Sequence, residues 1–140
     1  MTVRDRQATV LRWVLVLHGV ITLAGAVVLT VFPTAIPAAV GVTVQRPDYL
    51  IVYLVAAAEL AVSVLSFGGA RLDDPAALRL IVTTLVVLHA ASGVLNIVYM
   101  AQTTTSTVLI VNTCMRFVVA AVLIIVWRTT DLHQTYGTSR

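Results

Sequence analysis

Six polar side chains stand inside long apolar stretches of this 140-residue sequence. An ionisable side chain at the centre of a membrane costs about 2.5–3.5 kcal/mol on insertion scales, so each such residue is a candidate for a functional role. A carboxyl group in a medium of low dielectric constant tends to stay protonated and can serve as a general acid. The set comprises one acid, two histidines, one arginine and two asparagines: Glu59, His18, His89, Arg116, Asn96 and Asn112.

Three of these residues are expected at a similar depth on three different helices. At about 1.5 Å of rise per residue, Glu59 lies about 13 Å from the expected inner boundary of its helix, His89 about 15 Å and Arg116 about 18 Å. The same count places His18 about 9 Å deep, on the inner side of that layer. Glu59, His89 and Arg116 are therefore the predicted catalytic group.

The asparagines are predicted to line the walls of a cavity above this layer. His89 and Asn96 are seven residues apart, and Asn112 and Arg116 are four apart, so each pair shares one helical face. In a four-helix bundle such faces converge on the interior. The pattern predicts a cavity that opens outward, with His18, Asn96 and Asn112 as substrate-binding residues.

The composition indicates a membrane protein, because 59% of the residues are hydrophobic and only 11% are charged. A small soluble fold leaves too much of its surface wet to hide so much apolar area. A helix needs about 20 residues to cross the hydrocarbon core. We therefore predict an all-α, integral membrane four-helix bundle that forms a single domain over residues 1–140, with spans at about 12–32, 49–67, 79–100 and 107–127.

The arginines predict the orientation of the spans. Lysine is absent, and the chain carries nine arginines. Arg46 alone falls in a connection expected on the outer side, whereas Arg116 lies within a span and the others flank the inner ends. By the positive-inside rule both termini face the cytoplasm, and the protein lies in the plasma or inner membrane. The first span is longer than the apolar region of a signal peptide, so we interpret it as a retained helix.

The connections between the spans differ in length and character. Residues 33–47 form the longest one, which could fold over the outer face as a short surface helix or lid, or serve as an ordinary connector. In the second connection, Asp73 or Asp74 is the expected N-cap and Pro75 occupies the first helical turn. The single cysteine, Cys114, excludes a disulfide within the chain.

The overall pattern resembles the DoxX-like group of small bacterial four-span membrane proteins. The resemblance is carried by the glycine-rich first span "HGVITLAGAVVL", the following "FPTAIPAAVG" and the acid embedded in "AAAEL". It covers the four spans and implies no functional residue. Some members of that group accompany membrane oxidoreductases, so the resemblance implies an accessory subunit as an alternative to an enzyme.

The residues favour an enzyme that acts on a lipophilic, isoprenoid-type substrate. Glu59 would protonate an olefin or epoxide in a dry cavity and start a cyclisation or isomerisation, a logic similar to that of membrane terpene cyclases. A second reading is a non-catalytic accessory or lipid-binding protein with a structural polar core. A third places a haem b between His18 and His89, although their predicted depths differ by about 6 Å.

The expected partners follow from the same features. They are the lipid bilayer and a lipophilic small molecule, and a homo-oligomer is compatible with the pattern. We expect no cofactor and no metal, since zinc spacings and phosphate-binding loops are absent. The basic pI of about 9.6 reflects the inner-side arginines and anionic lipid, so it gives no indication of nucleic-acid binding.

Overall fold

The computed structural model describes residues 3–103 and 105–136, and side chains from Thr9 to Thr129. Within these residues the regular structure is entirely helical, as the sequence predicts. Four helices are long and apolar enough to cross a membrane. They are α1 (Val3–Val31), α3 (Tyr49–Gly69), α4 (Pro75–Gln102) and α5 (Thr107–Tyr136), and two short helices, α2 (Ala35–Ala39) and the 3-10 helix η1 (Arg46–Asp48), lie between α1 and α3.

The exposed surface of the long helices is the surface of a membrane protein. Leu80 is 70% exposed, Leu50 67% and Leu95 66%, and large aliphatic side chains of this kind are exposed along every span. In water these faces would drive aggregation, whereas in hydrocarbon they contact lipid tails. The helical backbone also satisfies its own polar groups, which a lipid environment requires.

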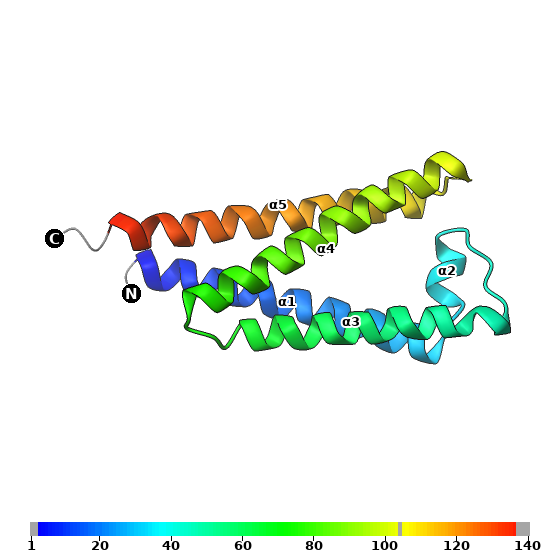
Figure 1. Cartoon of the computed structure of the whole chain (residues 1–140), viewed down its shortest axis with the longest axis horizontal. Helices are drawn as coiled ribbons and strands as arrows, with labels where there is room; N and C mark the ends of the chain where they lie inside the picture. The colour runs from blue at the N-terminus through cyan, green and yellow to red at the C-terminus, as the bar shows by residue number, and fades with distance from the viewer. Residues whose placement is uncertain (1–2, 104, 137–140) are drawn as a thin grey trace.

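The four long helices are arranged as two antiparallel pairs. α1 packs along α3, and α4 packs along α5, while the contacts between α3 and α4 are few. Figure 1 shows the two pairs close together where α1 begins and α5 ends, and further apart toward α2. We call the first region the terminal half and the second the loop half. The described ends of α1 and α5 lie at the same end of the molecule, as an even number of spans requires.

All four helices contribute to the core of the terminal half. The buried cluster takes side chains from α1, α4 and α5, and side chains of α3 pack against it. In the loop half the buried cluster comes from α1 and α3 alone, covered by one residue of the connection. The first cluster consists of Leu11, Leu15, Ile81, Val82, Leu85 and Leu123, and the second of Leu29, Val52 and Ala56 with Val44 packed against them.

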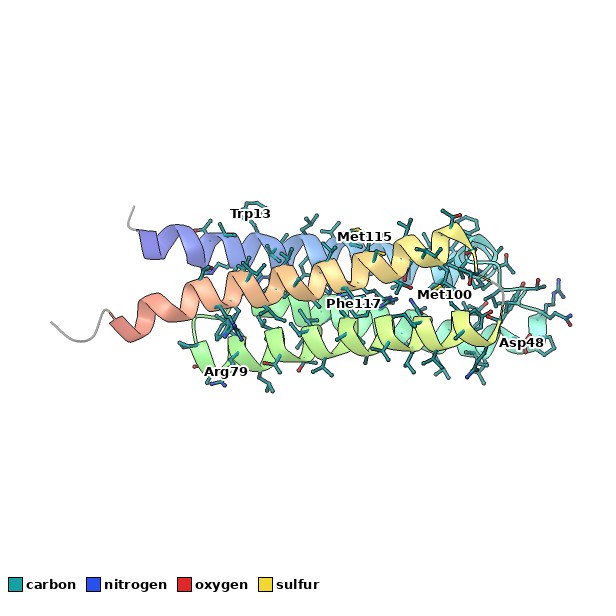
Figure 2. All side chains as sticks on the ribbon, turned by 90° about the horizontal axis from the view of Figure 1, so that it is seen from above. Trp13, Asp48, Arg79, Met100, Met115 and Phe117 are labelled. Carbon is teal, nitrogen blue, oxygen red and sulfur yellow. The ribbon has the colours of Figure 1, made fainter. Side chains whose placement is uncertain are left out.

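The turn between α3 and α4 closes the terminal end. Asp74 is the N-cap of α4, since its carboxylate accepts hydrogen bonds from the backbone N–H groups of Ala76 and Ala77 at 3.1 and 3.3 Å. Pro75 occupies the first helical position, where a missing N–H costs nothing. Asp73 forms an ion pair with Arg12, which fixes the turn to α1. Figure 2 shows Arg79 near this end and Asp48 at the opposite end.

The connection over residues 33–47 folds partly into a short surface helix, one of the alternatives that the sequence leaves open. α2 contains no buried residue and packs on the end of α1. Gly41 then reverses the chain with a φ of 85°, a conformation that glycine adopts without strain. The Ser106 hydroxyl donates a hydrogen bond to the Val40 carbonyl at 3.2 Å. This segment thus links the α1–α3 pair to the start of α5 at the loop end.

Candidate functional site

The two predicted histidines are in direct contact, together with a serine of α3. The Nε2 atoms of His18 and His89 lie 2.7 Å apart, and the rings meet edge to face with their centroids 5.0 Å apart. His18 Nδ1 lies 2.9 Å from the Ser66 hydroxyl. Three helices therefore meet through one chain of hydrogen bonds, which runs from α3 through α1 to α4.

This chain of contacts depends on the close approach of α1 and α3. The Ser63 hydroxyl donates to the Gly19 carbonyl at 2.9 Å, across the two helices. A Cβ atom at position 19 would lie only 3.0 Å from the Phe67 ring, so glycine is what allows the ring to pack there. Ser63 is 1% exposed and Ser66 is fully buried, so both hydroxyl groups act inside the bundle.

The position of His18 corrects the depth count made from the sequence. That count places His18 about 6 Å from the layer of His89, whereas the two rings share a hydrogen bond. The count assumes straight, untilted helices that start at their flanking arginines, but α4 begins at Pro75, four residues before Arg79. Side-chain reach closes the remaining gap, so His18 belongs to the same layer as His89.

The contact also bears on the haem reading. An iron held between two imidazole nitrogens needs these atoms about 4 Å apart, because each metal–nitrogen bond is about 2 Å long. The Nε2 atoms are 2.7 Å apart and bond directly to each other. In the described arrangement, His18 and His89 are therefore too close to be the two axial ligands of one haem iron.

A second polar cluster joins α4 to α5. Asn96 Nδ2 donates to Asn112 Oδ1 at 3.3 Å, and Arg116 Nε donates to the same oxygen at 3.0 Å. The predicted neighbourhood of these three residues is confirmed. One amide oxygen therefore anchors the guanidinium group through its Nε atom. Within the described side chains, no hydrogen bond or ion pair uses the two terminal nitrogens of Arg116.

Glu59 extends from α3 toward this second cluster without bonding to it. Glu59 is half-buried, and Arg116 is close enough to act on its carboxyl group electrostatically. Arg116 acts on His89 as well. Among the described side chains, however, the Glu59 carboxyl group makes neither a hydrogen bond nor an ion pair. Its neighbours are bonded to one another, while the acid itself has no bonded partner.

The six predicted residues thus form two bonded groups and one unbonded acid, contributed by all four long helices. His18 and His89 form the first group with Ser66, and Asn96, Asn112 and Arg116 form the second. Glu59 and Arg116, from the α1–α3 and α4–α5 pairs, interact electrostatically.

The structure has a surface groove of about 430 Å³ between α1 and α3 in the loop half, and this groove is not the predicted polar cavity. Its lining is almost wholly apolar and includes none of the six polar residues: Leu23, Ala26, Val27, Thr30, Val31, Tyr53, Ala56, Ala57 and Leu60. Ala56, one turn before Glu59 on α3, lines the groove, but Glu59 itself does not.

The sequence analysis missed two buried serines of α3. Ser66 contacts His18, and Ser63 holds α1 against α3. Small hydroxyl residues are common in membrane helices, so neither serine stands out by type. Their spacing did carry a signal, because Glu59, Ser63 and Ser66 follow one another at four and three residues and therefore share one face of α3. Comparison of the chain with protein-family models, curated proteins and solved structures finds no match.

Proposed function

We propose that this membrane protein binds a lipophilic, isoprenoid-type molecule between its two helix pairs and that Glu59 acts on it as a general acid. In this proposal the Glu59 carboxyl group gives its proton to a double bond, or to an epoxide oxygen as the C–O bond breaks, and the resulting cation cyclises or isomerises. The cation then loses a proton, which returns to the Glu59 carboxylate and leaves a neutral product. Arg116, held by Asn112, orients the polar end of the molecule. The resemblance to DoxX-like proteins concerns the four-span pattern and is compatible with this activity.

The observation that carries the proposal is the unbonded state of Glu59. A carboxylate kept only to neutralise Arg116 would bond to it directly, because an unpaired charge inside a membrane is expensive. Arg116 instead donates its Nε–H to the amide oxygen of Asn112. Among the described residues Glu59 has no bonded partner of its own, which leaves its carboxyl group available to a bound molecule or to a proton.

The second reading, a non-catalytic accessory or lipid-binding protein, draws on different contacts. The hydrogen bonds of His18, Ser63 and Ser66 hold α1, α3 and α4 together and need no substrate. They account for three polar side chains as structural elements. They do not account for Glu59, and this residue therefore separates the two readings.

The test is Glu59→Gln, which keeps the shape of the side chain and its capacity for hydrogen bonds but removes the acid. Purified protein in lipid nanodiscs is incubated with a panel of isoprenoid alcohols, olefins and epoxides, and the products are identified by mass spectrometry. We expect turnover by the wild type and a loss of about 100-fold or more in Glu59→Gln, the range that general acids contribute. Asp48→Asn is the matched control, because it makes the same exchange at the loop end.

Three outcomes would count against the proposal. Full turnover in a well-folded Glu59→Gln variant would remove the general acid. Failure of Glu59→Gln to fold, with rescue when Arg116 is also neutralised, would mark a structural ion pair. Absence of turnover by the wild type across the panel would favour the accessory or lipid-binding reading.

We further propose that the terminal end faces the cytoplasm, with the chain in a plasma or inner membrane. The arginine distribution supports this orientation, since Arg12, Arg71, Arg79 and Arg128 flank the terminal ends of the long helices and Arg46 lies at the loop end. Single cysteines at Thr43 and at Leu72, in a Cys114→Ala background, test it in intact cells. A membrane-impermeant thiol reagent should label position 43 alone, and labelling of position 72 alone would reverse the orientation.

A further inference from the structure

The hydrogen bonds around Ser66 determine which ring nitrogen of His18 carries a proton. The single hydroxyl hydrogen of Ser66 is donated to the Val62 carbonyl at 2.8 Å, within α3. The Ser66 oxygen can therefore only accept from His18 Nδ1, which lies 2.9 Å away. His18 is thus protonated at Nδ1, and in the neutral ring its Nε2 atom is an acceptor.

The tautomer of His18 determines that of His89. The two Nε2 atoms are 2.7 Å apart, so one must donate to the other. Because His18 Nε2 is the acceptor, His89 Nε2 is the donor. Neutral His89 then presents a bare, hydrogen-accepting Nδ1 atom. This atom is buried and has no hydrogen-bond partner, which is unusual for a buried polar atom.

The groups around His89 come from all three other long helices. Arg116 on α5 interacts with His89 electrostatically. His18 on α1 already occupies Nε2. Glu59 on α3 interacts with the same Arg116. His89 Nδ1 is thus an acceptor without a partner, and Arg116, which interacts electrostatically with His89, uses only its Nε donor in a hydrogen bond among the described side chains.

We propose that the polar end of the bound molecule is a hydroxyl group, which makes the ligand a lipophilic alcohol. Its O–H donates to His89 Nδ1, and its oxygen accepts from a terminal nitrogen of Arg116. An ether, epoxide or aldehyde of the same chain can accept from Arg116 but leaves Nδ1 unpaired. This assignment rests on the proposed function for the location of the site and adds the chemical class of the ligand.

Pairing with a ligand hydroxyl group would explain why the buried His89 Nδ1 atom has no partner within the protein. Nδ1 is closed to water in the described state, so a donor reaches it only when neighbouring side chains part to admit a ligand. The Phe117 ring packs on Gly93, one turn along α4 from His89. A site that leaves a buried polar atom unpaired discriminates strongly between molecules that do and do not satisfy it.

The first test compares three probes with the same C15 isoprenoid chain: the alcohol, its methyl ether and the corresponding aldehyde. Binding to wild-type protein in nanodiscs is measured by calorimetry. We expect the alcohol to bind about tenfold or more tightly than either acceptor-only probe, as one hydrogen bond to a buried group implies. Nitrogen-15 spectra of histidine-labelled protein should show a shift of the bare His89 Nδ1 signal with the alcohol alone.

The second test removes the group that sets the tautomers. In Ser66→Ala, His18 Nδ1 loses its acceptor, both tautomers of the pair become accessible, and His89 Nδ1 can itself become a donor. The preference for the alcohol should then fall by several-fold. Ser63→Ala is the matched control, because it also removes a buried hydroxyl between α1 and α3 but none that touches the rings. It should keep the wild-type preference.

The outcomes separate this inference from the proposed function. Equal binding of the three probes by the wild type, or an unchanged His89 Nδ1 signal with the alcohol, would overturn the hydroxyl assignment. Either result would leave the proposed binding site and function unaffected. Binding of none of the probes would overturn both. Equal loss of preference in Ser63→Ala and Ser66→Ala would show that packing, and not the tautomer, controls selectivity. The nitrogen spectra of the wild type decide the question even when a variant does not fold.

Discussion

The two halves of the bundle are built differently. In the terminal half, α1, α4 and α5 share one buried cluster and α3 packs against it, so four helices form one core. In the loop half, the buried cluster belongs to α1 and α3 only, and the α4–α5 pair stands apart from it. The terminal half therefore has a core shared by both pairs, whereas the loop half has a buried cluster within one pair.

The polar residues lie where these two constructions meet. The His18–His89 contact links the two pairs just above the shared core, since His18 follows Leu15 and His89 follows Leu85 by about one turn. Glu59 and the Asn112–Arg116 group lie further toward the loop half, where Glu59 and Arg116 interact without a bond. The shared core thus holds the two histidines in place, and our proposal locates the ligand beside Glu59 and Arg116, further toward the loop half.

The largest effect is expected from removing a side chain of the shared core. Leu85 is fully buried, so Leu85→Ala should lower the free energy of unfolding by about 2–5 kcal/mol. Leu29→Ala, in the two-helix cluster, should cost less because that site can relax toward lipid. The measurement is reversible unfolding in mixed micelles. Leu95→Ala is the control, since Leu95 is 66% exposed and its loss should change little.

Equal costs for Leu85→Ala and Leu29→Ala would contradict the distinction between the halves. They would indicate that the α4–α5 pair packs against the α1–α3 pair along its whole length. A larger loss in the free energy of unfolding for Leu29→Ala than for Leu85→Ala would reverse the distinction and make the loop half the more stable one.

The helical fold was predictable because length and apolar composition alone determine a membrane span. The four expected spans agree with the observed helices, and Asp74 and Pro75 begin α4 as their types indicate. The grouping of Asn96, Asn112 and Arg116 was also predictable, because spacings within one helix and a facing helix require no knowledge of tilt. These inferences depend on local chemistry and on the membrane as solvent.

The arrangement of helices into two pairs was not predictable from the same signals. Apolar helices in lipid have no hydrophobic preference for one neighbour over another, so pairing depends on small residues and on polar contacts between helices. Gly19, Ser63 and Ser66 determine the close α1–α3 approach, yet each is an ordinary residue in such a span. The direct His18–His89 bond was missed for the related reason that helix tilt does not follow from residue counts.

The smallest effect concerns the link that bridges the two pairs at the loop end. The Ser106 hydroxyl oxygen accepts from the Leu109 backbone N–H as the cap of α5, and the hydroxyl donates to the Val40 carbonyl. Ser106→Asp keeps a capping oxygen but has no hydroxyl donor, so it should free the 33–47 connection without weakening α5. We expect amide hydrogen exchange in this connection to rise about threefold, consistent with a partly solvated hydrogen bond of under 1 kcal/mol.

Ser106→Thr is the control, because it keeps both bonds and should exchange like the wild type. If Ser106→Asp left exchange unchanged while Ser106→Ala raised it, the serine would act only as a helix cap, and the two pairs would have no such link at the loop end.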